Sequence, residues 1–320
     1  MRRLWLIVLG LVASIGAMAV IALPRGGIGT ESLLVPGRAE YGQTNAGDNA
    51  AGVLLVSFNI RYASANDGPD RWELRRDKVI ATIEDLGADI VGLQEAEAAQ
   101  VRELLTALPR YAAAGVHRDD GRTRGEACTI LYDRQRFTIG ESGVFWLSDT
   151  PEVVASKSWD NTITRQCVWA RLIDMRSGEG LYVFNVHFDH RGQQSREKSA
   201  ALVFERAFTL ARRQDRQDAV VLLGDLNASE ENPAIAILTR PADDDGGPRF
   251  RDSYRAVRAE GAAGTFNGFD PASDGGAAKI DYVFVGPGLK VLEAGIDRRT
   301  IDGRYPSDHF PVWARITSEK

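Results

Sequence analysis

Six segments of the sequence place carboxylate, imidazole or amide side chains at one end of a short apolar run. In four of them the polar group follows the run: LLVSFN ends at Asn59, DIVGLQE at Glu95, LYVFNVH at His187, and VVLLGDLN at Asp225 and Asn227. In two later segments the polar group comes first, because Asp281 opens IDYVFV and Ser307-Asp308-His309 opens FPVWARI. If the last two strands run antiparallel to the first four, all six segments bring their polar groups to one edge of the sheets.

Such an edge would hold four carboxylates, two histidines and two asparagines. Like charges repel each other, and a divalent cation among them relieves the repulsion. The oxygen-rich set favours a hard cation such as Mg²⁺ or Mn²⁺. A cation of this kind polarises a phosphoryl oxygen and helps to generate hydroxide, and a His–Asp pair tunes proton transfer near neutral pH.

Each of these residues also has a purely structural interpretation. Asn59 alone could cap a turn, and Glu95 could complement the dipole of a following helix. Asp225 and Asn227 could form an Asx turn, and His187 could be a core histidine. All of these interpretations would have to hold together to remove the site, so the pattern favours function.

The rest of the chain alternates β-branched apolar runs with amphipathic stretches, which indicates an α/β fold. The segments between Arg240 and Asp274 are rich in Gly, Asp and Ala and are expected to form long surface loops. The expected strands are Val53–Phe58, Ile90–Leu93, Ala127–Tyr132, Gln166–Ile173, Leu181–Val186, Val220–Leu223, Ile280–Val285 and Phe310–Ile316. The expected helices are Arg75–Leu86, Ala98–Leu108, Ser195–Arg213 and Pro233–Leu238.

The N-terminus carries an export pattern. Arg2 and Arg3 precede an uncharged run over residues 4–23, and positive charge before an apolar run keeps that end of the chain in the cytoplasm. Residues 1–24 are therefore expected to be either a cleaved signal peptide or an N-terminal membrane anchor. Both interpretations place the rest of the protein in the periplasm or outside the cell, released or tethered to the inner membrane.

Composition and charge limit the remaining choices. Residues 25–51 are rich in Gly, Ala and Asn and are expected to be a flexible linker, which leaves 52–320 as the catalytic domain. The formal net charge is -5, which argues against a tight grip on long nucleic acid without excluding nuclease chemistry. Cys128 and Cys167 are open to two interpretations, a disulfide in an oxidising compartment or two buried free thiols.

Taken together and in order, the motifs resemble those of the endonuclease/exonuclease/phosphatase superfamily, the DNase I-like fold. The resemblance covers roughly Gly52 to Ile316. It rests on Phe58-Asn59, Leu93-Gln94-Glu95, Asn185-Val186-His187, Gly224-Asp225-Leu226-Asn227, Lys279-Ile280-Asp281-Tyr282 and Ser307-Asp308-His309. It implies a four-layer α-β-β-α sandwich of two mixed β-sheets flanked by helices.

The resemblance also implies roles for these residues. Glu95 would be the main metal ligand, with Asn59 and Asp308 beside it. Asp225 would orient or deprotonate the attacking water, and Asn227 and His187 would bind phosphate oxygens. His309 would transfer a proton or stabilise the transition state, with Asp281 as its orienting partner. Attack would be in line, with inversion at phosphorus and no covalent enzyme intermediate.

Other segments resemble a bacterial subgroup of the superfamily, among them Asn59-Ile60-Arg61-Tyr62, Arg71-Trp72-Glu73-Leu74-Arg75, Val116-His117-Arg118-Asp119-Asp120-Gly121 and His187-Phe188-Asp189-His190-Arg191-Gly192. Cations complement a phosphate, so Arg61, His190 and Arg191 are expected to bind substrate. A hydrogen-bonded pair that stabilises the loop is the alternative for His190 and Arg191.

The resulting hypothesis is a divalent-metal-dependent phosphoester hydrolase, a phosphodiesterase or nuclease or a phosphatase. Its substrate would be nucleic acid, a nucleotide, a sugar phosphate or a phospholipid head group, and no protein partner is implied. One alternative is a dinuclear zinc hydrolase using His187, Asp189 and His190, although zinc prefers several nitrogen or sulfur ligands. The other is a non-catalytic binding protein of the same fold, which would be expected to lack at least one core residue.

Overall fold

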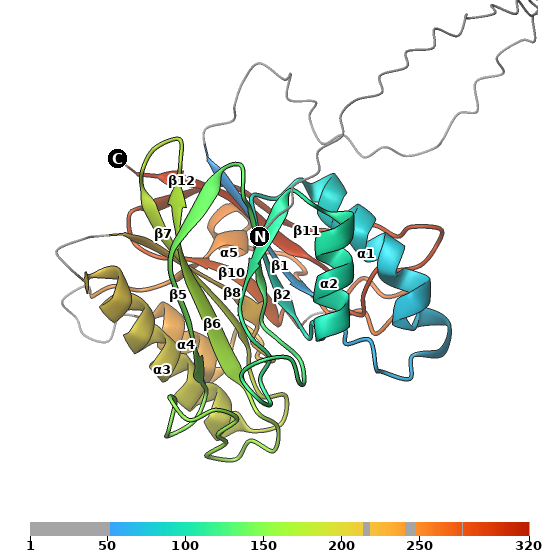
Figure 1. Cartoon of the computed structure of the whole chain (residues 1–320), viewed down its shortest axis with the longest axis horizontal. Helices are drawn as coiled ribbons and strands as arrows, with labels where there is room; N and C mark the ends of the chain where they lie inside the picture. Colours follow the sequence, from blue (N-terminus) through green and yellow to red (C-terminus); the bar gives the residue numbers. More distant parts are fainter. Residues whose placement is uncertain (1–51, 214–217, 241–246, 277, 320) are drawn as a thin grey trace, which may run out of the picture. The chain divides into compact units, whose positions relative to one another are not determined.

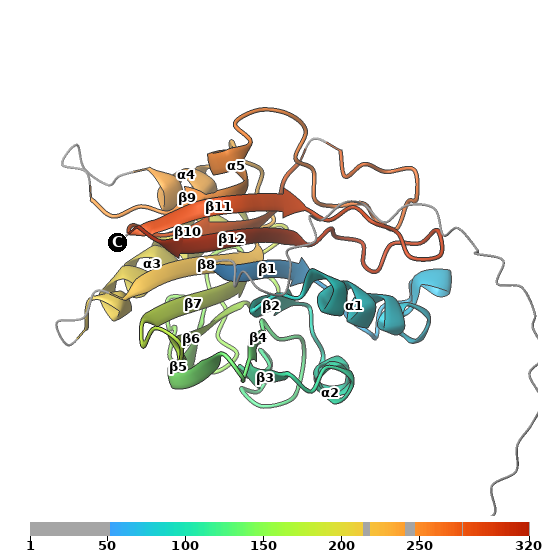
Figure 2. The same ribbon diagram turned by 90° about the horizontal axis from the view of Figure 1, so that it is seen from above.

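Two six-stranded sheets form the centre of the molecule. The computed structural model describes residues 52–213, 218–240, 247–276 and 278–319. The first sheet has the order β11 (Leu289–Ile296), β12 (Val312–Ser318), β1 (Val53–Asn59), β2 (Ile90–Gln94), β4 (Ile130–Asp133) and β3 (Tyr111–Ala114). The second has the order β5 (Phe137–Trp146), β6 (Gln166–Asp174), β7 (Gly180–His187), β8 (Ala219–Asp225), β10 (Asp281–Val285) and β9 (Arg251–Asp252). Figure 2 shows both orders, with β11 and β9 at one end and β3 and β5 at the other.

Helices cover the outer faces of both sheets, as Figure 1 shows. A one-turn 3-10 helix, η1 (Gly68–Asp70), leads into α1. The first sheet packs against α1 (Trp72–Leu86) and α2 (Ala98–Ala107) through one apolar layer, and the second packs against α3 (Gln193–Ala211) and α4 (Pro233–Thr239) through another. A third apolar layer fills the space between the sheets. With α5 (Ser253–Val257) the architecture is the expected four-layer sandwich of two mixed sheets.

The inner strands are continuous apolar runs because both of their faces are covered. In β1 every residue after Val53 is buried, and β2 and β10 are buried throughout. A strand with two covered faces needs apolar side chains on both, which is why these segments do not alternate.

A polar bridge joins the two sheets beneath their common edge. Gln94 at the end of β2 donates from Nε2 to Asn185 Oδ1 on β7 at 2.7 Å. Asn185 in turn donates to the backbone carbonyls of Leu93 and Thr129 at 2.9 and 3.1 Å. A Cβ on Gly92 would lie 2.9 Å from Asn185 Oδ1, so glycine allows this close approach. All of these groups are buried, and the bridge fixes the end of β2 against the end of β7.

Most of the expected elements are present, and the differences concern edges and loops. The strand expected at Ala127–Tyr132 begins at Ile130, and Ala127 makes only an isolated bridge to Ala96. The sequence did not predict β3, β5, β9 or β11. The expectation of long loops between Arg240 and Asp274 was wrong in part, because β9 and α5 lie there.

Cys128 and Cys167 are both free and buried. Cys128 lies in the apolar layer between the two sheets, whereas Cys167 lies in the layer between the second sheet and α3. Strand β6 therefore separates the two thiols. Of the two interpretations of these cysteines, the structure agrees with two buried free thiols and not with a disulfide.

The expected signal peptide or anchor over residues 1–24 and the expected linker over residues 25–51 lie outside the described residues. Within the described part of the chain, none of the helices combines the length and the apolar character needed to cross a membrane.

Candidate active site

The polar ends of the inner strands meet at one edge of the sandwich. Strands β1 and β2 are parallel, as are β7 and β8, whereas β12 is antiparallel to β1 and β10 to β8. In the second sheet His187 and Asp281 both pair with Asp225, one from each side. The antiparallel arrangement assumed for the last two strands is confirmed.

Glu95 lies just after β2 in the left-handed backbone region, with φ 60°. This conformation costs about 1–3 kcal/mol for a residue with a side chain and persists only where the surroundings enforce it. Here both carboxylate oxygens are held: Oε1 accepts from Asn59 Nδ2 at 3.1 Å and Oε2 from the Tyr62 N–H at 3.1 Å. The turn aims the Glu95 carboxylate back across the ends of the strands.

Asn59 links the two sheets at this edge. Its amide nitrogen donates to Glu95 and, at 3.0 Å, to Asp225 Oδ2, and its oxygen accepts from the Arg61 N–H. Ser307 Oγ donates to the Asn59 carbonyl at 2.7 Å, which ties the segment carrying Asp308 and His309 to the end of β1.

Arg75 positions the same region from outside the cavity. Its guanidinium is buried and donates to the backbone carbonyls of Ile60, Arg61, Asp70 and Pro306. A single side chain on α1 therefore fixes the segment after β1 against the segment before β12.

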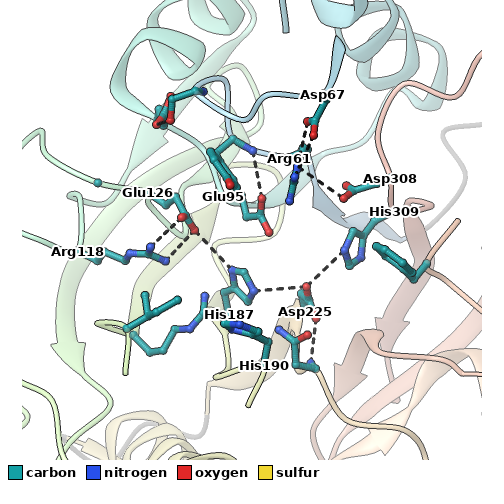
Figure 3. Close-up of a pocket in the computed structure, with 18 of the residues that line it drawn as sticks. Arg61, Asp67, Glu95, Arg118, Glu126, His187, His190, Asp225, Asp308 and His309 are labelled. Atoms are coloured by element: carbon teal, nitrogen blue, oxygen red, sulfur yellow. Dashed lines mark hydrogen bonds and ion pairs between the residues drawn. The ribbon is translucent and has the colours of Figure 1, made fainter. Parts of the chain in front are cut away.

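Asp225 lies between two imidazoles, as Figure 3 shows. Its Oδ2 is 3.5 Å from His187 Nε2 and 3.8 Å from His309 Nε2. Asp281 Oδ2 lies 2.9 Å from Nδ1 on the other side of the His309 ring, and both residues are buried. An acid, a histidine and a second acid are thus aligned, which is an arrangement suited to moving a proton.

Burial and the neighbouring charges set the protonation of this group. Burial, and then the charge of Asp281, raises the pKa of Asp225 to about 7. Burial alone would lower the pKa of His309, but the charges of Asp281 and Asp225 outweigh it and raise that pKa well above its ordinary value. Near neutral pH His309 is therefore a cation held between two acids, and Asp225 is poised to exchange a proton.

His187 has the opposite character. Burial, followed by the positive charges of Arg165 and Arg118, holds the pKa of His187 well below its ordinary value. His187 is therefore neutral near pH 7 and can donate only one hydrogen bond from its ring.

A cavity of about 810 Å³ opens onto these groups. Of the expected site residues, it is lined by Arg61, Glu95, His187, His190, Asp225, Asn227, Asp308 and His309. Asn59 and Asp281 are buried behind this surface and contact it through Glu95, Asp225 and His309.

The structure places the three side chains expected to bind substrate, Arg61, His190 and Arg191, in three different ways. Arg191 is exposed and does not belong to the cavity wall. Arg61 lines the cavity, but its guanidinium forms two hydrogen bonds of 3.0 Å with Asp67. Asn227, expected to bind phosphate oxygens, donates from its amide to the Phe188 carbonyl at 3.1 Å. His190 is exposed and borders the cavity.

Among the further residues that line the cavity and were not expected as site residues are Arg118, Glu126, Arg165 and Phe266. Glu126 forms two hydrogen bonds of 2.7 Å with Arg118, and Arg165 lies buried beside His190. Phe266, which lies in a region expected to be loop, packs edge-on against His309 at 5.0 Å between ring centroids. The only sequence signal among them was the segment Val116–Gly121, which carries Arg118; the others follow no apolar run that would mark them.

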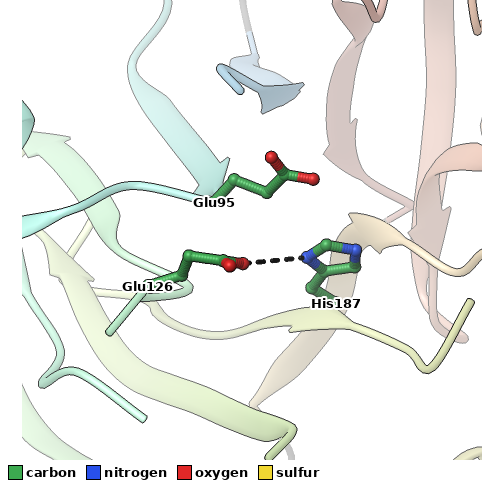
Figure 4. A group of neighbouring side chains, drawn as sticks. All are labelled: Glu95, Glu126 and His187. Carbon is green, nitrogen blue, oxygen red and sulfur yellow. Dashed lines mark ion pairs between the residues drawn. The ribbon is translucent and has the colours of Figure 1, made fainter. Parts of the chain in front are cut away.

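Two groups of side chains bring their ligand atoms close enough for one metal ion. Glu95, Glu126 and His187 form one, drawn in Figure 4, and Asp225, Asp281 and His309 form the other. Glu95 and Asp308 also line the cavity, and burial together with the charge of Glu95 raises the pKa of Asp308. Crowded carboxylate oxygens of this kind fit a hard divalent cation.

The alternative zinc set is not brought together. Asp189 turns its Oδ1 to the N–H groups of Arg191 and Gly192, at 2.9 and 2.7 Å. Neither Asp189 nor His190 belongs to a potential metal group among the described residues. Among the described residues, His187, Asp189 and His190 therefore do not form a metal group together, and Asp189 stabilises the turn after β7.

Two mixed sheets between helices, with acids and histidines at one edge, define the architecture of the DNase I-like class. Residues 56–309 match the Endonuclease/Exonuclease/phosphatase family. The chain belongs to this family.

The chain matches similar solved structures over nearly the whole length of those structures. The endonuclease/exonuclease/phosphatase from Bacteroides vulgatus is 31% identical, with a TM-score of 0.75 over 83% of this chain and 99% of that one. The mannosyl-6-phosphatase of Bacteroides thetaiotaomicron VPI-5482 is 33% identical, with a TM-score of 0.73 and the same coverage. Among curated relatives, the protein L388 of Acanthamoeba polyphaga mimivirus is 30% identical over 169 residues, which are 50% of this chain. The match spans 61% of that relative.

Proposed function

We propose that this protein is a divalent-metal-dependent phosphatase that hydrolyses the phosphoric monoester of a small polar molecule such as a sugar phosphate. The observation that carries the proposal is the alignment of Asp225 between two imidazoles, facing Glu95 and Asp308 across one cavity. The similarity to a mannosyl-6-phosphatase, whose chain is covered to 99%, supports the choice of substrate class.

Glu95 and Asp308, with Asn59 beside them, would hold the cation. When bound, the cation supplies positive charge to the phosphoryl oxygens and favours deprotonation of water.

Asp225 would accept a proton from the attacking water, since its pKa is raised to about 7 and two imidazoles lie beside it. The water oxygen forms a bond to phosphorus, and the ester P–O bond breaks in line with it. His309, protonated and fixed by Asp281, would stabilise the charge that develops on the phosphoryl oxygens. The leaving alkoxide takes up a proton from solvent water and Asp225 returns its proton to solvent, so the products are inorganic phosphate and the free alcohol.

A small substrate fits the charge of the cavity better than a polymer does. The chain has a net charge of -5, and two of the arginines that line the cavity, Arg61 and Arg118, are already neutralised by Asp67 and Glu126. Binding of long nucleic acid draws its affinity from many free cations along the backbone. A cavity of about 810 Å³ has the size of a small-molecule site.

We also propose that the enzyme acts outside the cytoplasm, because Arg2 and Arg3 precede the uncharged run over residues 4–23. A fusion of residues 1–51 to a reporter that is active only after export tests this. An inactive fusion would rule out export, and fractionation of the full chain distinguishes release from a membrane tether.

The central experiment is hydrolysis by the full chain of mannose 6-phosphate, glucose 6-phosphate, p-nitrophenyl phosphate, bis-p-nitrophenyl phosphate, single-stranded DNA and a phosphoinositide. Each substrate is tested with Mg²⁺, with Mn²⁺ and with EDTA. We expect metal-dependent release of phosphate from a sugar phosphate, lost in Asp225→Asn. Preferential cleavage of DNA or of the diester would overturn the monoester proposal, and Glu95→Ala protein with full activity would overturn the metal site.

A further inference from the structure

Three guanidinium groups line the cavity, and their surroundings differ. Arg61 is held by Asp67, with Asp308 Oδ2 at 3.8 Å from its Nε. Arg118 is held by both oxygens of Glu126 at 2.7 Å. Both guanidinium groups have carboxylate partners at hydrogen-bond distance. The negative charge of these partners weakens the attraction of each guanidinium for an anionic ligand.

Arg165 is the exception. Its side chain is 4% exposed, and its nearest carboxylate oxygen is Asp189 Oδ2, 3.9 Å from Nε. Only Nη2 makes a hydrogen bond, with His190 Nδ1 at 3.2 Å; Nε and Nη1 have no hydrogen-bond partner within the described residues. A buried cation without such partners is unfavourable unless another group completes it. Asp189 Oδ2 is also buried and has no hydrogen-bond partner within the described residues, so its long contact with Nε compensates the Arg165 charge only in part. An anion that reaches the guanidinium from the cavity would complete that compensation.

His190 extends the donor set. A guanidinium only donates hydrogen bonds, so His190 Nδ1 must be the acceptor in its contact with Arg165. Burial and the charge of Arg165 lower the pKa of His190, so the neutral ring carries its proton on Nε2. His190 borders the same cavity and offers this N–H as a further donor.

Arg165 also lies close to the reacting groups. It lines the cavity together with His187 and Asp225, and its charge acts on His187. It precedes β6, the neighbour of β7 in the second sheet, and is thus anchored by the strands that carry the site.

We infer that Arg165 binds the phosphoryl group of the substrate and, with His190, selects the monoester dianion over a diester. This inference rests on the proposed function. A monoester presents three terminal oxygens and close to two negative charges, whereas a diester presents two oxygens and one charge. The planar fork of Arg165 can donate to two oxygens at once. If the cation takes one terminal oxygen, a monoester still offers two to the fork, whereas a diester offers one.

The test compares Arg165→Gln and Arg165→Lys with the parent chain on p-nitrophenyl phosphate and bis-p-nitrophenyl phosphate. We expect Arg165→Gln to lower the monoester-to-diester ratio of kcat/KM by about tenfold or more, because one charge-assisted interaction is specific to the monoester. Arg165→Lys keeps the charge but not the fork and should recover part of the ratio. Inhibition by inorganic phosphate should weaken in the same order.

Arg171→Gln is the matched control. Arg171 lies on β6 as well, but its guanidinium donates to Asp218 at 2.7 Å and does not line the cavity. This variant should leave the ratio unchanged. Equal loss of monoester and diester hydrolysis in Arg165→Gln, or unchanged inhibition by phosphate, would overturn the inference.

Calorimetric titration with inorganic phosphate in EDTA separates this inference from the proposed function. If the parent chain hydrolyses neither ester, the proposed function fails, but binding of phosphate that is lost in Arg165→Gln would still support the anion site. Absence of phosphate binding by a folded parent chain in EDTA would overturn the inference, whereas the proposed function is decided by hydrolysis with metal. Arg165→Gln also removes the cation nearest to the buried Asp189 carboxylate, so thermal unfolding of each variant is measured to show that it is folded at the assay temperature.

Discussion

Asp281→Asn is the most informative single change in the reaction centre. The carboxylate of Asp281 is fully buried and lies 2.9 Å from His309 Nδ1. Asparagine has the same shape and can still accept a hydrogen bond from His309. The substitution therefore removes a charge from behind the imidazole without creating a cavity.

The size of the effect follows from that one contact. A hydrogen bond to a charged partner contributes about 1.5–3 kcal/mol. Each 1.36 kcal/mol lost in the transition state reduces the rate about tenfold. We therefore expect kcat to fall about 10- to 100-fold, while KM changes little because Asp281 does not line the cavity.

The pH dependence gives a second, independent signature. The charge of Asp281 contributes to raising the pKa of Asp225 to about 7, so its removal lowers that pKa and extends activity to lower pH on the acid side. The same charge raises the pKa of His309 against the effect of burial, so its removal makes His309 lose its proton at lower pH. Both limbs of the rate profile should move in the same direction, toward lower pH.

The assay is the pH profile of kcat on p-nitrophenyl phosphate at saturating metal, with thermal unfolding measured alongside. Asp77→Asn on α1 is the control, because its side chain is 83% exposed and its ion pair is with the neighbouring Arg76 on the surface, away from the cavity lining. A profile that loses height without shifting would show that Asp281 only positions the ring. An unchanged kcat would refute the assignment of His309.

Three further outcomes are expected. Glu95→Gln should raise the Mg²⁺ concentration needed for half-maximal activity by at least about tenfold, measured by metal titration, because it removes a charge from the ligand set; an unchanged titration would contradict this role. Cys128 and Cys167 should resist a thiol reagent in the folded chain and both react after unfolding without reductant; fewer thiols would indicate a disulfide. Asn185→Ala should lower the free energy of unfolding in urea by about 3 kcal/mol, at about 1 kcal/mol for each of three buried partners; a loss below about 1 kcal/mol would remove the sheet bridge as a stabilising feature.

The sequence predicted the inner strands because burial on both faces leaves a continuous apolar run. The four missed strands all lie at sheet edges, where one side of the strand has no neighbouring strand. β5, for example, has exposed residues from Thr138 to Gly140 and contains Glu141 and Ser142. β3 and β11 are edge strands of the first sheet. Edge strands tolerate polar residues and glycine, so their composition resembles that of loops.

The acids and histidines of the site were predictable for a related reason. A carboxylate that ends an apolar strand stands out, and strand direction then determines which of these residues meet. The positions of the available arginines could not be predicted in the same way. Arg61 and Arg191 were expected at the phosphate from their place in the motifs, but the availability of a guanidinium depends on which carboxylates the loops bring to it. Only the folded chain shows that Arg61 is hydrogen-bonded to a carboxylate, whereas Arg165 has a carboxylate no nearer than 3.9 Å.

The backbone conformation at the ends of the inner strands also could not be predicted from the sequence. Arg61, Glu95 and Asn227 all have positive φ, at 54°, 60° and 47°, and each directly follows or lies within two residues of the end of an inner strand. Sequence analysis associates this conformation with glycine, so none of the three positions was marked by it. Each costs about 1–3 kcal/mol, which the surrounding hydrogen bonds must offset. All three residues line the cavity, so the strained left-handed conformations occur where the chain leaves the inner strands and borders the site.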